Sequence, residues 1–198
     1  MTNPETGTIM IVDLPSPYTG GERAAVIMDM IQEHPEFDRL RSSTLKYPTC
    51  WATFTGYPLI AEWDLDEDGP HLFVEGLRTM AMKAAVYELT GDERAAELLV
   101  AAPVDEMVHA LTAQFTILSR IQADLRVTFV HSTDAERFDY DVDGYTDQIY
   151  RAARWGELPR RYWLGKAETA RRLNILSEHY ESIGVQAGGR SHYFTFGR

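Results

Sequence analysis

Apolar residues recur every three or four positions over several long stretches of this chain, and no other sequence feature constrains the fold as strongly. That period places apolar side chains on one face of an α-helix, which must then pack against another element. The longest stripe predicts one helix from residue 104 to about residue 125, with these apolar positions: Val104, Met107, Val108, Leu111, Phe115, Leu118 and Leu125.

Capping and stop signals predict further helices. Thr19 and Glu22 have capping-box spacing at the start of a helix over residues 21–34, and Gly91 is typical of the position just beyond a helix. Residues 35–48 contain two prolines and have no clear period, so we expect a loop with at most one helical turn there. The remaining predicted helices cover residues 70–91, 92–102, 145–156 and 166–181.

Runs rich in β-branched and aromatic residues predict β-strands between these helices. The predicted strands cover residues 8–14, 49–56, 57–65 and 126–131, and residues 185–198 are expected to form a strand or hairpin. Because helices and strands are mixed without strict alternation, the expected fold class is α+β. We expect a helix-rich single domain over residues 1–198 with a small mixed or antiparallel sheet.

The composition is that of an ordinary soluble globular protein, with 44% apolar and 25% charged residues. The single cysteine, Cys50, excludes an intramolecular disulfide and indicates a reducing compartment. The polar N-terminus lacks a signal-peptide pattern, and no apolar run approaches the roughly 20 residues of a membrane span. We therefore expect a cytoplasmic protein without a membrane partner.

The charge is divided unevenly along the chain, whose net charge is −11. Residues 1–149 carry 10 Lys and Arg against 26 Asp and Glu, a net of −16, whereas residues 150–198 carry 9 against 4, a net of +5. The overall acidity argues against general adhesion to nucleic acid or membranes. The asymmetry indicates a specific partner: either a basic protein surface that meets the acidic part, or a phosphate that meets the basic part.

Two acidic loops share the pattern Asp-x-Asp-x-Asp-Gly. The first satisfies the full calcium-loop expression, although the strand-like residues before it are not the helix that an EF-hand requires. Two interpretations stay open: a bound divalent cation, or an acidic helix start with Asp68 as the N-cap. The candidate metal ligands of this loop are Asp64, Asp66, Asp68 and Glu75.

The second loop has Tyr150 where the closing glutamate of a calcium loop belongs; its candidate ligands are Asp139, Asp141 and Asp143. Alternate residues on a strand share a face, so Asp64 would point with Asp66 and Asp139 with Asp141. If the two loops meet, such carboxylate pairs could hold Mg²⁺ or Mn²⁺ against a phosphate.

The C-terminal segment, residues 150–198, interleaves arginines with aromatic residues. Arginine for phosphate and aromatic rings for bases is the combination expected for a nucleotide or single-stranded nucleic acid. In the alternative interpretation, the arginines pair with the acidic part of the chain and the aromatics fill the core. The arginines are Arg151, Arg154, Arg160, Arg161, Arg171, Arg172 and Arg190.

Near the C-terminus, AGGRSH presents Arg190 and His192 after a Gly-Gly turn, where they could bind a phosphate as catalytic residues. This stretch resembles the glycine-rich, histidine-bearing strand of the archaeo-eukaryotic primase and primase-polymerase superfamily, in which an earlier hDhD strand binds the catalytic metal. FDYDV at 138–142 and WDLD at 63–66 have that form. The family pattern also has a third carboxylate after the histidine, and the six residues after His192 contain none.

Other site patterns are absent from the sequence. It contains no P-loop, no GxGxxG and no GxSxG. The six histidines are scattered and show neither HExxH nor zinc-type Cys/His spacing, so we expect no structural zinc.

Three functions remain as hypotheses. The first is a protein that uses a divalent cation (Mg²⁺, Mn²⁺ or Ca²⁺), held by the loop carboxylates, to act on or bind a phosphate-bearing substrate held by Arg190 and His192. The alternative is a non-catalytic acidic interaction protein, such as an inhibitor, a mimic or an assembly factor, that binds a basic partner surface. The third is a structural protein stabilised by calcium through Glu75.

Overall fold

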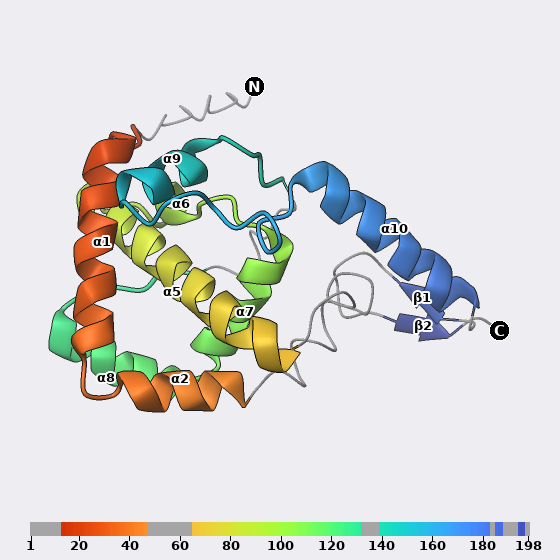
Figure 1. Ribbon diagram of the computed structural model, residues 1–198, viewed down its shortest axis with the longest axis horizontal. Helices are drawn as coiled ribbons and strands as arrows, with labels where there is room; N and C mark the ends of the chain where they lie inside the picture. Colours follow the sequence, from red (N-terminus) through yellow and green to blue (C-terminus); the bar gives the residue numbers. More distant parts are fainter. Residues whose placement is uncertain (1–12, 47–64, 132–138, 183–184, 188–193, 197–198) are drawn as a thin grey trace, which may run out of the picture.

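The computed structural model describes residues 13–46, 65–131, 139–182, 185–187 and 194–196, and helices occupy most of this part of the chain (Figure 1). The helices and strands, in chain order, are α1 (Pro17–Glu33), α2 (Phe37–Leu45), α5 (Leu65–Thr90), α6 (Glu93–Ala96), α7 (Ala102–Thr112), α8 (Phe115–Leu125), α9 (Tyr145–Ala152), α10 (Lys166–Ser182), β1 (Val185–Ala187) and β2 (Phe194–Phe196).

Helix α5 forms the centre of the fold. Over residues 72–86 nearly all of its side chains are buried, on every face of the helix. A helix that is apolar all round has to be covered by other elements, and α1, α2, α6, α7 and α9 all pack against α5. The core is therefore built by helices around a helix.

Two glycines allow close approach between these helices. A Cβ atom at Gly21 of α1 would lie 2.6 Å from the backbone nitrogen of Ala153, at the end of α9. A Cβ atom at Gly76 of α5 would lie 2.8 Å from Cγ of Met107 on α7. A larger residue at either position would force the two helices apart.

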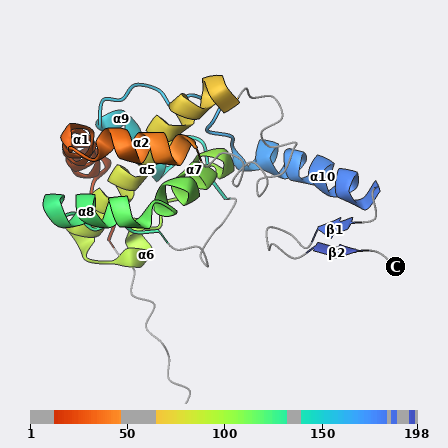
Figure 2. The same ribbon diagram turned by 90° about the horizontal axis from the view of Figure 1, so that it is seen from below.

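Helix α10 and the two strands extend to one side of the helical body (Figures 1 and 2). Strands β1 and β2 pair antiparallel, with Val185 opposite Phe196 and Ala187 opposite Phe194. This pairing agrees with the hairpin expected at the C-terminus.

The predicted α+β fold class is wrong. In the described residues, β-structure is limited to these two three-residue strands, and no sheet packs against the helical core. The predicted strand over 126–131 is also wrong, because these residues form a connection without a strand partner. Val127 and Val130 are buried there, so their β-branched side chains anchor the connection to the core.

Two helix predictions also need correction. Residues 37–45 form α2, where a loop was expected, and the single helix expected over 104–125 is divided into α7 and α8 at residues 113–114. Helix α1 begins earlier than predicted: its N-cap is Ser16, whose hydroxyl accepts a hydrogen bond from the Thr19 N–H at 3.1 Å.

The other predicted helices are confirmed within a few residues as α5, α6, α9 and α10. Gly91 has a φ of +66° directly after α5, as expected for a glycine beyond a helix C-terminus. The strands expected over 49–56 and most of those over 8–14 and 57–65 lie outside the described residues, as does Cys50. No helix in the described ranges combines the length and apolar character that crossing a membrane requires.

Candidate metal centre

The first acidic loop lies at the start of α5. Asp64 is outside the described residues, and Asp66 is exposed in the first turn of the helix. Asp68 is inside the helix, so the predicted N-cap role is wrong. Its buried carboxylate accepts two hydrogen bonds of 2.9 Å from the Arg161 guanidinium and one of 2.7 Å from the Tyr162 hydroxyl.

Glu75 is also buried, with 4% of its surface exposed. One carboxylate oxygen accepts from Trp163 Nε1 at 2.8 Å, and the other accepts from Arg78 at 2.8 Å and from the Tyr150 hydroxyl at 3.1 Å. Protein donors therefore occupy both oxygens of the residue predicted to close the calcium shell.

In the second loop, Asp139, Asp141 and Asp143 are all exposed. Asp141 pairs with Lys166 at 2.8 Å, and Asp143 pairs with Arg151 at 2.6 Å. The Arg151 guanidinium lowers the pKa of the Asp143 carboxyl below its ordinary value.

No predicted ligand in the described ranges belongs to a group of three metal-ligating side chains. Because Asp64 lies outside those ranges, its shared site with Asp139 stays a prediction, and so do the roles of Arg190 and His192.

Most arginines of the C-terminal segment pair with carboxylates of the same chain, as the alternative interpretation expected. These pairs are Arg151–Asp143, Arg160–Asp147, Arg161–Asp68, Arg171–Glu168 and Arg172–Glu168. Aromatic residues of this segment, including Tyr150, Tyr162 and Trp163, belong to the core.

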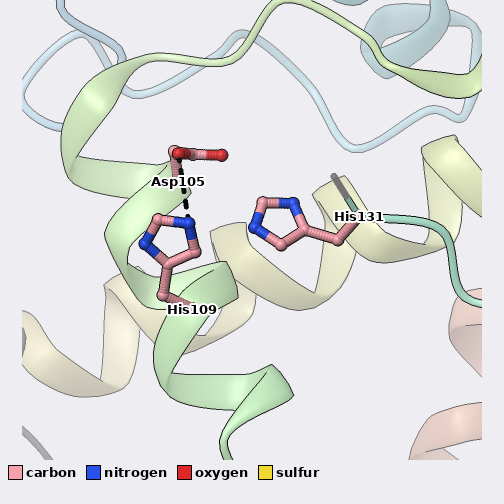
Figure 3. A group of neighbouring side chains, drawn as sticks. All are labelled: Asp105, His109 and His131. Carbon is pink, nitrogen blue, oxygen red and sulfur yellow. Dashed lines mark ion pairs between the residues drawn. The ribbon is translucent and has the colours of Figure 1, made fainter. Parts of the chain in front are cut away.

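A different group of side chains has the composition of a metal centre. Asp105, His109 and His131 each offer one ligand atom, and these atoms lie within 4.8 Å of one another. Asp105 and His109 are one turn apart on the same face of α7, and His131 follows the buried anchor Val130. Figure 3 shows the two imidazole rings facing each other beside the Asp105 carboxylate.

The dimensions of this group suit a transition-metal ion after a small contraction. Three atoms within 4.8 Å of one another fit inside a circle of radius about 2.8 Å, and zinc bonds to nitrogen or oxygen are about 2.0–2.2 Å long. Inward shifts of less than about 1 Å would bring all three donors into bonding distance.

The neighbours of His109 orient its ring. Nδ1 lies 3.4 Å from an oxygen of buried Glu106, and Nε2 lies 3.8 Å from Asp105 Oδ2. A carboxylate accepts hydrogen bonds and cannot donate them, so each nitrogen has to present either a proton or a bound cation to its carboxylate. Glu106 takes the Nδ1 proton, which leaves Nε2 to share a cation with Asp105 and His131.

On the other side of the group, Lys83 lies 3.3 Å from His131 Nδ1 and 2.8 Å from Glu97 Oε2. Its side chain is 2% exposed, at the middle of α5. An ammonium group only donates, so Nδ1 accepts, and a metal at Nε2 would replace the proton that the neutral ring carries there.

The charge of these six side chains also favours a divalent cation. The three carboxylates are Asp105, Glu106 and Glu97, and Lys83 supplies one positive charge, which leaves −2 when both imidazoles are neutral. Uncompensated charge is costly in a largely buried cluster, and a divalent ion would neutralise it.

The scattered histidines thus concealed a pair that the fold brings together. His109 and His131 have ring centroids 4.8 Å apart, although α8 lies between them in the sequence. One signal was visible beforehand: Asp105-Glu106-x-x-His109 places two carboxylates three and four residues before a histidine on a predicted helix.

Comparisons with protein-family models, with curated protein sequences and with solved structures find no match to this chain.

Proposed function

We propose that this protein binds a divalent transition-metal ion through Asp105, His109 and His131, and that this centre is the functional site. The observation that supports the proposal is the convergence of two imidazoles and one carboxylate from separate segments, with a second carboxylate, Glu106, behind His109. Two histidines and one carboxylate are a recurrent ligand set for zinc and for non-haem iron.

Three protein ligands leave coordination positions for water or for a substrate atom. An ion held in this way polarises a bound carbonyl or phosphoryl oxygen, or lowers the pKa of a bound water so that it becomes a nucleophile near neutral pH. The proposal keeps the metal-dependent function expected from the sequence and moves the metal from the acidic loops to α7. A phosphate-bearing substrate and the acidic interaction surface both stay predictions.

Titration of chelator-treated protein with Zn²⁺, Mn²⁺, Ca²⁺ and Mg²⁺ in a calorimeter tests this assignment. We expect one Zn²⁺ or Mn²⁺ per chain, weaker binding of Ca²⁺ and Mg²⁺, and a rise in the melting temperature on binding, because the ion binds the native state. His109→Gln and His131→Gln should each reduce the affinity for Zn²⁺ at least tenfold.

Matched controls separate this site from the acidic loops. Asp66→Asn and Asp141→Asn remove exposed carboxylates of the two loops and should leave Zn²⁺ binding unchanged. His71→Gln removes an exposed histidine outside the group and should also have no effect. Stoichiometric binding that survives both His109→Gln and His131→Gln, or that is lost in Asp66→Asn, would contradict the proposed ligand set.

A further inference from the structure

A cavity of about 550 Å³ lies between α6, the first turn of α9 and the residues before α1. This volume is within the usual range for small-molecule sites. Two hydrogen bonds tie its walls together: the Thr146 hydroxyl donates to the Leu99 carbonyl at 2.8 Å, and the Tyr145 hydroxyl donates to the Pro15 carbonyl at 2.7 Å. The cavity is therefore a built feature of the fold.

The lining of the cavity is mostly apolar. Leu14 and Leu99 both line it and are 47% and 38% exposed, which is unusual for leucine. Leu98 and Ala95 complete this apolar wall. A ligand with an apolar body would cover these side chains and remove them from water.

Glu97 places a hydrogen-bond acceptor at the cavity. Its Oε2 accepts from Lys83 at 2.8 Å, whereas its Oε1 is buried and accepts no hydrogen bond from the described residues. A buried carboxylate oxygen without a donor is costly. A ligand that brings an N–H donor, and above all an ammonium group, would complete this carboxylate.

Arg94 places a cation at the same cavity, three residues before Glu97. Its side chain is exposed and forms no ion pair or hydrogen bond with any described residue. By contrast, Asp141, the other charged residue of the lining, is already paired with Lys166. The guanidinium is thus the group in the cavity that suits a carboxylate.

We propose that this cavity binds an apolar amino acid or a short apolar peptide, with the ammonium group at Glu97, the carboxylate at Arg94 and the side chain against the leucines. The proposal goes beyond the metal centre and does not depend on it, since none of the three metal ligands lines the cavity.

Calorimetry with three related compounds tests each contact in turn. L-Phenylalanine carries both charged groups, phenethylamine lacks the carboxylate and 3-phenylpropionate lacks the ammonium. We expect L-phenylalanine to bind at least fivefold more tightly than either truncated compound, because each charge-assisted contact adds to affinity.

Two variants assign the two charged contacts. Arg94→Gln should weaken L-phenylalanine and 3-phenylpropionate about fivefold and leave phenethylamine unchanged. Glu97→Gln should weaken L-phenylalanine and phenethylamine and leave 3-phenylpropionate unchanged. Since Arg94 is exposed, Arg94→Gln does not threaten the fold, and Arg39→Gln, on α2, is its matched control.

Leu99→Trp fills the cavity from its exposed edge and should abolish binding of all three compounds. Three outcomes would overturn the proposal: no binding of L-phenylalanine at millimolar concentration, equal affinities for the three compounds, or full binding by the Leu99→Trp protein.

Discussion

Three buried carboxylates, Asp68, Glu75 and Asp147, share one mode of stabilisation. Each accepts hydrogen bonds from one arginine and from at least one aromatic side chain. Ionised carboxylates are buried only when their lone pairs are occupied in this way. Two of the three had been metal candidates, and the same chemistry that attracts a cation, oxygen ligands in a crowded acidic segment, is answered here by guanidinium groups.

The contribution of this arrangement can be measured at Asp147, which is fully buried and binds Arg160 and the Tyr140 hydroxyl. Asp147→Asn removes the charge and one acceptor and leaves the arginine without its counterion. We expect the free energy of unfolding to fall by about 3 kcal/mol, measured by urea denaturation.

Asp143→Asn is the matched control for this change, because Asp143 is exposed in the same turn and pairs with Arg151 at the surface. Its unfolding midpoint should equal that of the unmodified protein. Equal midpoints for both variants would show that the buried network does not stabilise the fold.

The limits of sequence-based prediction are clear at the same scale. The acidic patterns were visible because their residues are neighbours in the chain, whereas the metal centre joins His131 to α7 across α8. Only its Asp105 and His109 half is encoded locally, by helix periodicity. The partner from the 127–131 connection depends on tertiary packing, which spacing along the chain does not reveal.

At the scale of the elements, the contact between α1 and α9 depends on the absence of a side chain at Gly21. A Cβ atom there would lie 2.5 Å from Ala152 Cβ and 2.6 Å from the Ala153 backbone nitrogen. Backbone atoms cannot move aside as the end of a flexible side chain can, so the helices would have to separate.

Gly21→Ala should therefore lower the free energy of unfolding by about 1–3 kcal/mol, although alanine is the better helix former. Gly20→Ala, one position earlier, is the control: its new Cβ would meet the flexible Ile149 side chain at an ordinary 3.4 Å. Thermal melts of the two variants should differ in sign or clearly in size. A Gly21→Ala protein as stable as Gly20→Ala would contradict the close packing of α1 on α9.

Helix periodicity predicted most of the elements, and the errors have physical causes. Helix α2 buries only Leu40 and Thr44, so its sequence shows too few apolar positions for a visible period. The break between α7 and α8 falls inside a continuous apolar stripe, because the two short helices each bury part of it. The α+β class failed because β-branched residues in the 126–131 segment serve as core anchors, and strand propensity alone does not supply a pairing partner.

For the whole molecule, the aromatic hydroxyls of the buried network link stability to pH. Burial raises the pKa values of Tyr140 and Tyr150 well above the ordinary value near 10, and burial together with Asp68 raises the pKa of Tyr162 to about 12. These side chains hold α5, α9 and residues 158–164 together. The loss of their protons would weaken the whole helical body.

We expect the free energy of unfolding to be independent of these tyrosines below pH 10 and to fall as the pH rises from 10 toward 12. In that range the unfolded chain releases the phenolic protons and the folded chain retains them, so alkali favours unfolding. Denaturant titrations across this range measure the effect.

Tyrosinate absorbance gives a second measurement: part of the signal from the ten tyrosines should appear only when the fold is lost. Tyr162→Phe should reduce the dependence on pH, and an unchanged slope in that variant would count against the role of this hydroxyl.

Lys83 connects two regions that have been described separately, since its one ammonium group lies between Glu97 at the cavity and His131 at the metal centre. Any molecule that draws Lys83 toward one partner changes its interaction with the other. Two ligands that compete for, or release, the same group are thermodynamically linked. If both occupants bind as proposed, the factor by which the metal changes affinity for the amino acid must equal the factor by which the amino acid changes affinity for the metal. That equality makes this single lysine the place where the two sites communicate.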